Sequence, residues 1–440
     1  MASRNILVAI RREVADYFTG DPRYRFEGLS DSNQVGGALV LSQRRRVGGG
    51  ERRKLVIRYS FGRHALDRTV DADEHLRYEY RWLRRLLGCE HILQMIPMAD
   101  CSVELPGTSD GRRPPYPPYA YGARSASASS LDTRPSRWKR MRQALRRRLP
   151  ARWSQGAGND GLYGVRPEAI VPLENRRYPT FATEYLPLGT LKQFLHRVLH
   201  KDYVMIPNRL LWRIWLCIVR QNIAMAFPPD IPDGQYRGQL IRETLKPQIQ
   251  LRLVHYANHL DNMVFADSDS ILKGIEHGEP HLGVKLLEFS RVKMANWEES
   301  LWNLPTRPDE FASRHNLFNA AFTLQSIACF TAYLAGETFS VDYNSAATYP
   351  VDMGGFQFRD VRTFAHPVFM DNEAVDPSLR QLICRTMNTR AADTPSLKTQ
   401  LDICLEAVKR GEDDPGFPRI GTDETDSTIR KMLKECIYDA

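Results

Sequence analysis

Hydrophobic and polar positions along the first hundred residues follow the periods of amphipathic helices and short strands. Apolar residues recur at helical spacing over residues 1–17, which predicts an amino-terminal helix. Two apolar bursts, residues 39–47 and 54–60, flank the triplet Gly48-Gly49-Gly50, a pattern typical of a β-hairpin. Residues 71–87 begin with acidic side chains and end with arginines, the polarity that a helix dipole favours.

The apolar run over residues 91–98 predicts another strand, and the pattern then dissolves between residues 101 and 177. Order resumes over residues 178–199, where a strand, a turn and a helix are expected. Residues 209–226 predict a long apolar helix, and residues 311–335 predict the most apolar helix of the chain. Because strands come first and helices follow, the pattern favours an α+β fold over a doubly wound parallel sheet.

The composition is that of a folded protein whose positive charge is concentrated in one segment. A chain of 440 residues, 42% of them hydrophobic, can form a two-lobed unit with insertions and is not wholly disordered. The formal net charge is +9, and residues 110–152 carry twelve Arg or Lys against two Asp. The rest of the chain is therefore almost neutral, and one basic insert gives the protein its charge.

This insert, at about residues 101–177, is expected to be a disordered basic surface loop. Prolines and serines dominate its low-complexity stretches. Trp138, Met141, Leu145 and Leu149 recur at intervals of three or four residues, so a short basic amphipathic helix is the alternative. In either form the arginines could contact nucleic acid or an anionic membrane.

The cysteines and the hydropathy indicate the cellular setting. Seven scattered cysteines without Cys-x-x-Cys spacing predict neither a structural zinc site nor a disulfide framework, and no haem site is expected. The sequence contains no stretch of 18 consecutive apolar residues, so no transmembrane segment is expected. We therefore expect an intracellular protein, cytoplasmic or nuclear.

Five short motifs follow one another in a specific order: Ser32–Val40 with two adjacent glycines, Leu55-Val56-Ile57-Arg58, Phe181–Leu186, His255–Asn262, and Glu288-Phe289-Ser290. Their order and spacing resemble the protein-kinase family from about Asn33 to Leu405. The resemblance implies a two-lobed α+β fold, with a small antiparallel sheet and one main helix in the first lobe. The expected organisation is a helical extension over residues 1–30, the small lobe over 31–190, the helical lobe over 191–410, and a tail with a short helix over 411–440.

The loop His255–Asn262 resembles the family's catalytic loop, His-Arg-Asp-Leu-x-x-x-Asn, but Ala257 stands where the family has its catalytic aspartate. No catalytic residue is therefore intact. Neither His259 nor Asp261 has the offset from Asn262 that a replacement base would need. The metal-binding Asp-Phe-Gly of the family resembles Glu288-Phe289-Ser290, which makes Asn262 and Glu288 the metal candidates.

The nucleotide site that the resemblance implies is changed as well. Arg58 replaces the family's lysine and could pair with Glu79, while Val56 replaces a small alanine beside the adenine. Thr183 is expected as gatekeeper, and the backbone from Glu184 to Leu186 is expected to face the adenine. The nucleotide-binding candidates are Gly36, Gly37, Val40, Val56, Arg58, Glu79, Thr183, Glu184 and Leu186. The resemblance implies ATP with Mg²⁺ as ligand, and the substitutions predict weakened binding.

The positions that support a kinase fold persist. Leu83, His255 and Phe289 match the apolar spine that links the two lobes. Asn316 opens a helix similar to the family's αF, where aspartate is usual. Loss of chemistry within a retained scaffold favours a pseudokinase that acts as a signalling or scaffold module for protein partners. The alternatives are a divergent serine/threonine kinase, and a protein that binds nucleic acid or anionic membrane through the insert.

Overall fold

The computed structural model describes residues 2–20, 24–29, 36–44, 52–65, 71–96, 180–229, 240–247, 250–266, 283–287, 292–294, 311–337, 339, 346–352, 358–390, 393–418, 420 and 423–439. The expectations for the basic insert at 101–177 and for Glu288, Phe289 and Ser290 therefore lie outside the described residues.

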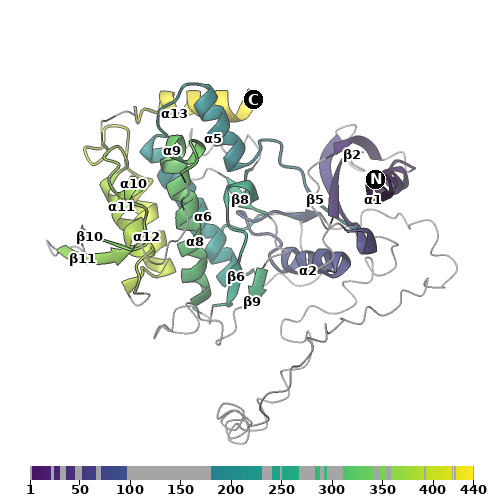
Figure 1. Ribbon diagram of the computed structural model, residues 1–440, viewed down its shortest axis with the longest axis horizontal. Coiled ribbons are helices and arrows are strands. Elements are labelled where there is room, and N and C mark those ends of the chain that lie inside the picture. Colours follow the sequence, from purple (N-terminus) through teal and green to yellow (C-terminus); the bar gives the residue numbers. More distant parts are fainter. Residues whose placement is uncertain are drawn as a thin grey trace, which may run out of the picture.

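A five-stranded antiparallel sheet forms the first part of the molecule (Figure 1). Val40 on β2 (Gly36–Arg44) lies opposite Val56 on β3 (Arg52–Ser60), which in turn lies opposite Thr183 on β5 (Thr180–Glu184). The pairing of β2 with β3 confirms the predicted hairpin. In spatial order the strands are β1 (Tyr24–Leu29), β2 (Gly36–Arg44), β3 (Arg52–Ser60), β5 (Thr180–Glu184) and β4 (Met95–Ile96). The edge strand β1 lies within the stretch expected to be a helical extension.

Two helices cover this sheet. Helix α1 (Ala2–Thr19), predicted from its helical spacing, buries Ile10, Val14 and Phe18 in a core that it shares with Leu39 and other sheet residues. Helix α2 (Ala72–Arg85) buries Leu76, Trp82 and Leu83 in a different core, while its first residue, Ala72, lies in the core of α1. Its predicted start is confirmed, because the carboxylate of the N-cap residue Asp71 accepts hydrogen bonds from the first-turn amides of Asp73 and Glu74. A short 3₁₀ turn, Gly62–His64, lies between β3 and α2.

The strand expected over residues 91–98 is much shorter in the structure. Of the described residues in this run, Met95–Ile96 alone joins the sheet, as β4. The preceding segment bonds to other main chain instead, since Ile241 N–H donates to Gly88 O at 2.7 Å and Leu93 N–H donates to Leu286 O at 3.1 Å. These contacts join the connection between α2 and β4 to the second part of the molecule.

The second part is mostly helical. Helix α6 (Asn208–Ala226) is buried along nearly its whole length, which explains why its sequence is apolar on all sides. It packs against α8 (Phe311–Ala328), and α5 (Leu191–His200) begins with the capping box of Thr190 and Gln193. The predicted apolar helix over 311–335 is interrupted at Cys329, after which α9 (Phe330–Leu334) continues.

The remaining described elements complete this part, and its short strands were not predicted. An antiparallel ribbon, β10 (Ala347–Asp352) with β11 (Phe358–Thr363), lies in a region that we expected to be mostly helical. Its short alternating pattern, with Val351 and Val361 buried, gives little signal in the sequence. The other elements are β6 (Leu253–His255), η6 (Leu260–Asn262), β7 (Met263–Phe265), β8 (Val284–Leu286), β9 (Val292–Met294), α10 (Pro367–Met370), α11 (Pro377–Thr386), α12 (Leu397–Ala407), α13 (Asp426–Leu433) and a π-helical turn, Lys434–Tyr438.

The small antiparallel sheet with α2 and the larger helical part together form a two-lobed, protein-kinase-like fold of the α+β class, as predicted (Figure 1). Within the described residues, all cysteines are buried and none of them forms a disulfide bond. No described helix is both long enough and apolar enough to span a membrane.

Candidate functional site

An ion pair joins the sheet to helix α2 between two of the residues that the resemblance made nucleotide-binding candidates. Arg58 Nη1 lies 2.6 Å from Glu79 Oε1, and the Glu79 side chain is only 1% exposed while that of Arg58 is 19% exposed. A carboxylate so deeply buried is stabilised only when it is paired. The structure therefore brings these two predicted residues together and fixes the guanidinium toward α2.

The strand register places the adenine-side candidates in one row. Val40, Val56 and Thr183 lie opposite one another on β2, β3 and β5. Side chains two residues apart on a strand share a face, so Val56 lies on the same face of β3 as Arg58. Val56 carries two methyl groups more than the alanine that the resemblance implies, and the narrowing of the site by these groups stays a prediction.

Gly36 and Gly37 open strand β2, opposite Ser60 and Tyr59. A Cβ added at Gly37 would lie 2.4 Å from Tyr59 Oη, because the buried Tyr59 ring covers this position. Gly37 is thus required by packing on the α1 side of the sheet. Contact of these glycines with a nucleotide stays a prediction.

Glu184, at the end of β5, links the lobes through its side chain. Its Oε1 accepts hydrogen bonds from Gln94 N–H at 2.7 Å and from Lys285 Nζ at 2.6 Å. The Glu184 amide donates to Gln94 O, so this N–H is not available to a ligand. The Glu184 carbonyl and the backbone of Leu186, which is half-buried against the main core, remain the hinge candidates.

Sequence reasoning missed Lys285, which lies on β8 only three residues before Glu288. Its side chain is 4% exposed, and Glu184 compensates its charge. The signal was present in the sequence, because a lysine inside the apolar run Val284–Leu287 must find a buried partner. Its partner lies 101 positions away in the sequence and could not be identified from it.

The loop from His255 to Asn262 is anchored to helix α8. His255 N–H donates to Asn316 Oδ1 at 2.8 Å, and Asn316 Nδ2 donates to Leu253 O at 2.8 Å. The Ala257 amide donates to His255 Nδ1, so the imidazole carries its hydrogen on Nε2 and donates it to Leu287 O at 3.0 Å. These contacts hold a loop of the predicted shape in place.

Leu83 and His255 are both fully buried, as expected for members of a spine. Because Phe289 is outside the described residues, stacking of the three side chains stays a prediction.

At Ala257 the loop has no acid or base. Its side chain is 2% exposed, and its carbonyl accepts a hydrogen bond from Asn262 Nδ2 at 2.9 Å. The nearby carboxylate of Asp261 lies 3.2 Å from Lys192 Nζ and 3.9 Å from His259 Nδ1. Asp261 therefore interacts with Lys192 on α5, and His259 lies close to Asp261 and Asn262. That neither replaces the missing base stays a prediction.

The fit of this site to Mg-ATP is partial. Asn262 Nδ2 donates to Ala257 O and lies 3.2 Å from His259 Nε2, so Oδ1 is the atom through which the side chain could contact a cation. Mg²⁺ requires an octahedral set of oxygen ligands. Within the described residues the predicted metal site contributes this one oxygen, and the contribution of Glu288 stays a prediction.

A further buried ion pair, which the sequence analysis did not predict, lies between the lobes. His91 Nδ1 is 2.6 Å from Glu243 Oε2, and His91 N–H donates to Glu243 Oε1 at 2.7 Å. Burial alone would lower the pKa of His91, but the Glu243 carboxylate and its hydrogen bonds raise it to about 10. Burial likewise tends to raise the pKa of Glu243, yet His91 holds it below its ordinary value. The pair is therefore imidazolium and carboxylate at neutral pH.

Glu90 lies beside this pair, so three groups that can bind metals come within 4.8 Å of one another. Arg242 Nε lies 3.4 Å from the Glu90 carboxylate, and Arg220 donates to the carbonyl of Glu243. These cations and the protonated His91 balance the acidic groups. The cluster is thus an ion-pair network that fastens the connection between α2 and β4.

No model of a known protein family matches this chain, and no curated protein matches it. Among solved structures, the chain is similar to one from a CAK complex of Chaetomium thermophilum bound to ATP-gamma-S. The two chains are 11% identical over 87% of this chain and 91% of that chain, with a TM-score of 0.45. A likeness this weak supports no inference, and the kinase-like fold assigned above rests on the described architecture.

Proposed function

We propose that this protein is a pseudokinase, a catalytically impaired kinase-like protein that acts as a signalling or scaffold module. The observation that carries the proposal is Ala257 at the base position, in a loop otherwise held by His255, Asn262 and Asn316. A positioned general base typically contributes about 10²–10⁴-fold to a rate. Asp261, a carboxylate in the described part of the loop, is paired with Lys192 and does not have the base's offset from Asn262, so we do not expect it to restore this contribution.

Nucleotide binding is a separate part of the proposal. Arg58 retains a positive charge, but its planar guanidinium is fixed by Glu79 and is a poor substitute for a compact ammonium at phosphates. Val56 would narrow the adenine side, because it replaces the small alanine that the resemblance implies. We infer that ATP with Mg²⁺ binds weakly or not at all. Protein partners would then recognise the two-lobed surface without phosphoryl transfer.

Incubation of purified protein with Mg-ATP, alone and with generic protein substrates, tests the proposal. We expect phosphate incorporation equal to that of the variant Glu288→Ala, because the site lacks its base. The proposal would be contradicted if the protein phosphorylated itself or a substrate at ordinary kinase rates and Glu288→Ala abolished this activity.

The rival is a divergent serine/threonine kinase, and the formed Arg58–Glu79 ion pair favours it because the family couples its lysine to this glutamate. A thermal-shift titration discriminates between the two. Saturable stabilisation by ATP with Mg²⁺ or Mn²⁺ would support the divergent kinase. If the melting temperature did not rise with ATP, this alternative would be contradicted.

The charge of residues 110–152 supports a third, compatible role, which is binding to nucleic acid or anionic membrane. Deletion of residues 110–155 should then reduce salt-dependent retention on RNA or anionic liposomes. Unchanged retention would dismiss this role.

A further inference from the structure

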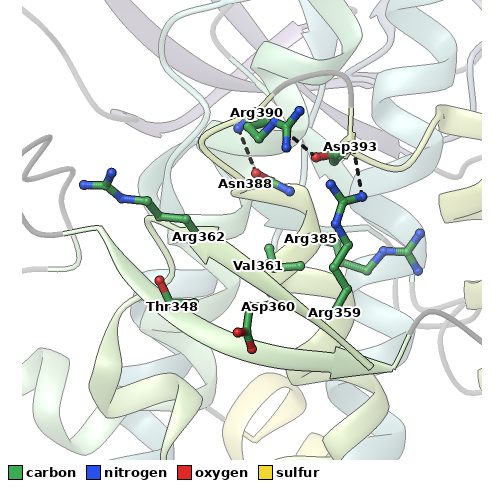
Figure 2. Close-up of a pocket in the computed structure, with 9 residues that line it drawn as sticks. All are labelled: Thr348, Arg359, Asp360, Val361, Arg362, Arg385, Asn388, Arg390 and Asp393. Atoms are coloured by element: carbon green, nitrogen blue, oxygen red, sulfur yellow. Dashed lines mark hydrogen bonds and ion pairs between the residues drawn. The ribbon is translucent and has the colours of Figure 1, made fainter. Parts of the chain in front are cut away.

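Strand β11 and the loop that follows α11 enclose a small pocket in the helical lobe (Figure 2). The two segments are joined at one end, where Thr389 N–H donates to Arg362 O at 2.9 Å. Beyond this bond they diverge and leave a cavity of about 270 Å³. The charged residues that line it are Arg359, Asp360, Arg362, Arg385, Arg390 and Asp393.

This pocket has an excess of positive charge. Four arginines and two aspartates line it, so its formal charge is +2. Arg359 and Arg390 approach the same carboxylate, that of Asp393, at 3.5 and 3.6 Å. Both distances exceed those of a normal charge-assisted hydrogen bond. One carboxylate thus serves two guanidinium groups and leaves both with unused donors.

The other two arginines add to this excess. The buried Nε of Arg385 has no hydrogen-bond partner within the described residues. Arg362 lies on the exposed face of the ribbon, opposite Thr348. The carboxyl end of α11 favours a cation at Arg385, but it does not account for three further arginines around the same cavity.

We propose that this pocket binds a phosphate monoester carried by a phosphorylated side chain of a partner protein. Guanidinium groups bind phosphate oxygens through paired hydrogen bonds, and arginine clusters are a recurrent means of recognising phosphorylated motifs. The volume is below the roughly 300–1,000 Å³ of pockets that enclose drug-sized ligands, so it suits one small anionic group. The phosphate group would supply the negative charge that the pocket lacks, since the single carboxylate of Asp393 is shared by Arg359 and Arg390.

The surroundings of the pocket favour a peptide over a membrane. Asp360 is exposed on the ribbon beside Arg362, and its carboxylate would face an anionic bilayer unfavourably. A single phosphorylated side chain covers a much smaller area than a bilayer, and the four arginines around the cavity outnumber the two aspartates that it would meet. The site also lies in the helical lobe, away from Ala257 and the nucleotide candidates, so it is independent of the proposed function.

The test compares two double variants of the full-length protein. Arg359→Gln/Arg385→Gln removes two positive charges from the pocket. Arg12→Gln/Arg25→Gln removes two from the sheet lobe, where both arginines are exposed and paired with acidic residues. Both variants keep the basic insert, so a difference in peptide affinity between them is due to the pocket arginines. Fluorescence anisotropy would be measured with a labelled degenerate peptide library centred on phosphoserine and with its unphosphorylated counterpart, at fixed ionic strength.

We expect saturable binding of the phosphorylated library only, competition by inorganic phosphate, and a loss of about tenfold or more in the pocket variant alone. Should that variant unfold, Arg362→Glu, on the exposed face of the ribbon, would replace it. Equal binding of both libraries, or equal losses in both double variants, would overturn the proposal. Capture by vesicles that contain phosphatidylinositol phosphate, dependent on the pocket arginines and without peptide binding, would also overturn it in favour of a membrane.

Discussion

Single residues determine what the loop from His255 to Asn262 can do. Asn316 uses both ends of its amide there, as acceptor for His255 N–H and as donor to Leu253 O. The loop is therefore held in place as firmly as a catalytic loop would need, although Ala257 supplies no base. We expect a retained loop anchor together with a missing catalytic base in a protein that keeps its fold for binding.

Replacement of Asn316 by alanine should destabilise the protein by roughly 2–4 kcal/mol, because it leaves two buried backbone groups without partners. Chemical denaturation measures this loss. The variant Asn316→Asp keeps the acceptor for His255 N–H and should lose less. Equal stability of Asn316→Ala and wild type would show that these bonds do not anchor the loop.

Restoring the residues typical of kinases tests whether Val56 and Arg58 weaken nucleotide binding. The double variant Val56→Ala/Arg58→Lys should be stabilised by ATP with Mg²⁺ more than the wild type is, since it recovers space and a compact ammonium. A thermal-shift titration provides the comparison. Leu29→Ala, which trims an exposed apolar side chain on β1, is the control and should leave the response unchanged. A wild type that already binds as well as the double variant would contradict the narrowed site.

At the scale of elements, contacts between segments that are distant in sequence hold the lobes together. The connection between α2 and β4 bonds to main chain near residues 241 and 286, and the His91–Glu243 pair lies within it. Glu184 and Lys285 make a second link, between β5 and β8. Both links are buried, so they constrain the lobes more than surface ion pairs would.

The His91–Glu243 pair makes stability depend on pH. His91 has a pKa raised from 6.5 to about 10 in the folded state, so its contribution is complete below about pH 6.5 and is lost as the pH rises toward 10. The free energy of unfolding should therefore fall across this range. His91→Gln should flatten that slope and cost roughly 3–5 kcal/mol at neutral pH, because it leaves a buried carboxylate without its ionic partner.

The exposed His259 provides the matched control for this experiment, and His259→Gln should keep the slope of the wild type. Urea denaturation at several pH values measures both variants. If the free energy of unfolding of His91→Gln falls with pH as steeply as that of the wild type, groups other than His91 cause the pH dependence.

The contact between β2 and β3 can be tested by adding one methyl group. Gly37→Ala would place a Cβ against the buried Tyr59 ring, and we expect a loss of about 1–3 kcal/mol from overpacking. Gly28→Ala is the control, since an added Cβ there meets no atom within 4 Å. Similar melting temperatures for the two variants would contradict the packing role of Gly37.

For the whole molecule, much of the fold was predictable from signals within single segments. Contacts between residues that are far apart in the sequence were not predictable in this way. Helix α2 was predictable because Asp71, the acidic first turn and the final arginines all act within one segment. The Arg58–Glu79 ion pair was predictable from motif positions. The partner of His91 lies 152 residues away, and nothing near either residue identifies it. The β10–β11 ribbon was missed because its alternation is short and Pro350 interrupts it.

The account of the molecule as a whole is that of a kinase-like fold without effective phosphoryl transfer. Its most direct test is a single-turnover measurement with the protein in molar excess over γ-labelled ATP and with saturating Mg²⁺, so that weak nucleotide affinity cannot hide slow chemistry. The account predicts transfer to protein at the background level of Glu288→Ala. Transfer that approaches the roughly 1–100 s⁻¹ of ordinary kinases, and that Glu288→Ala abolishes, would contradict it.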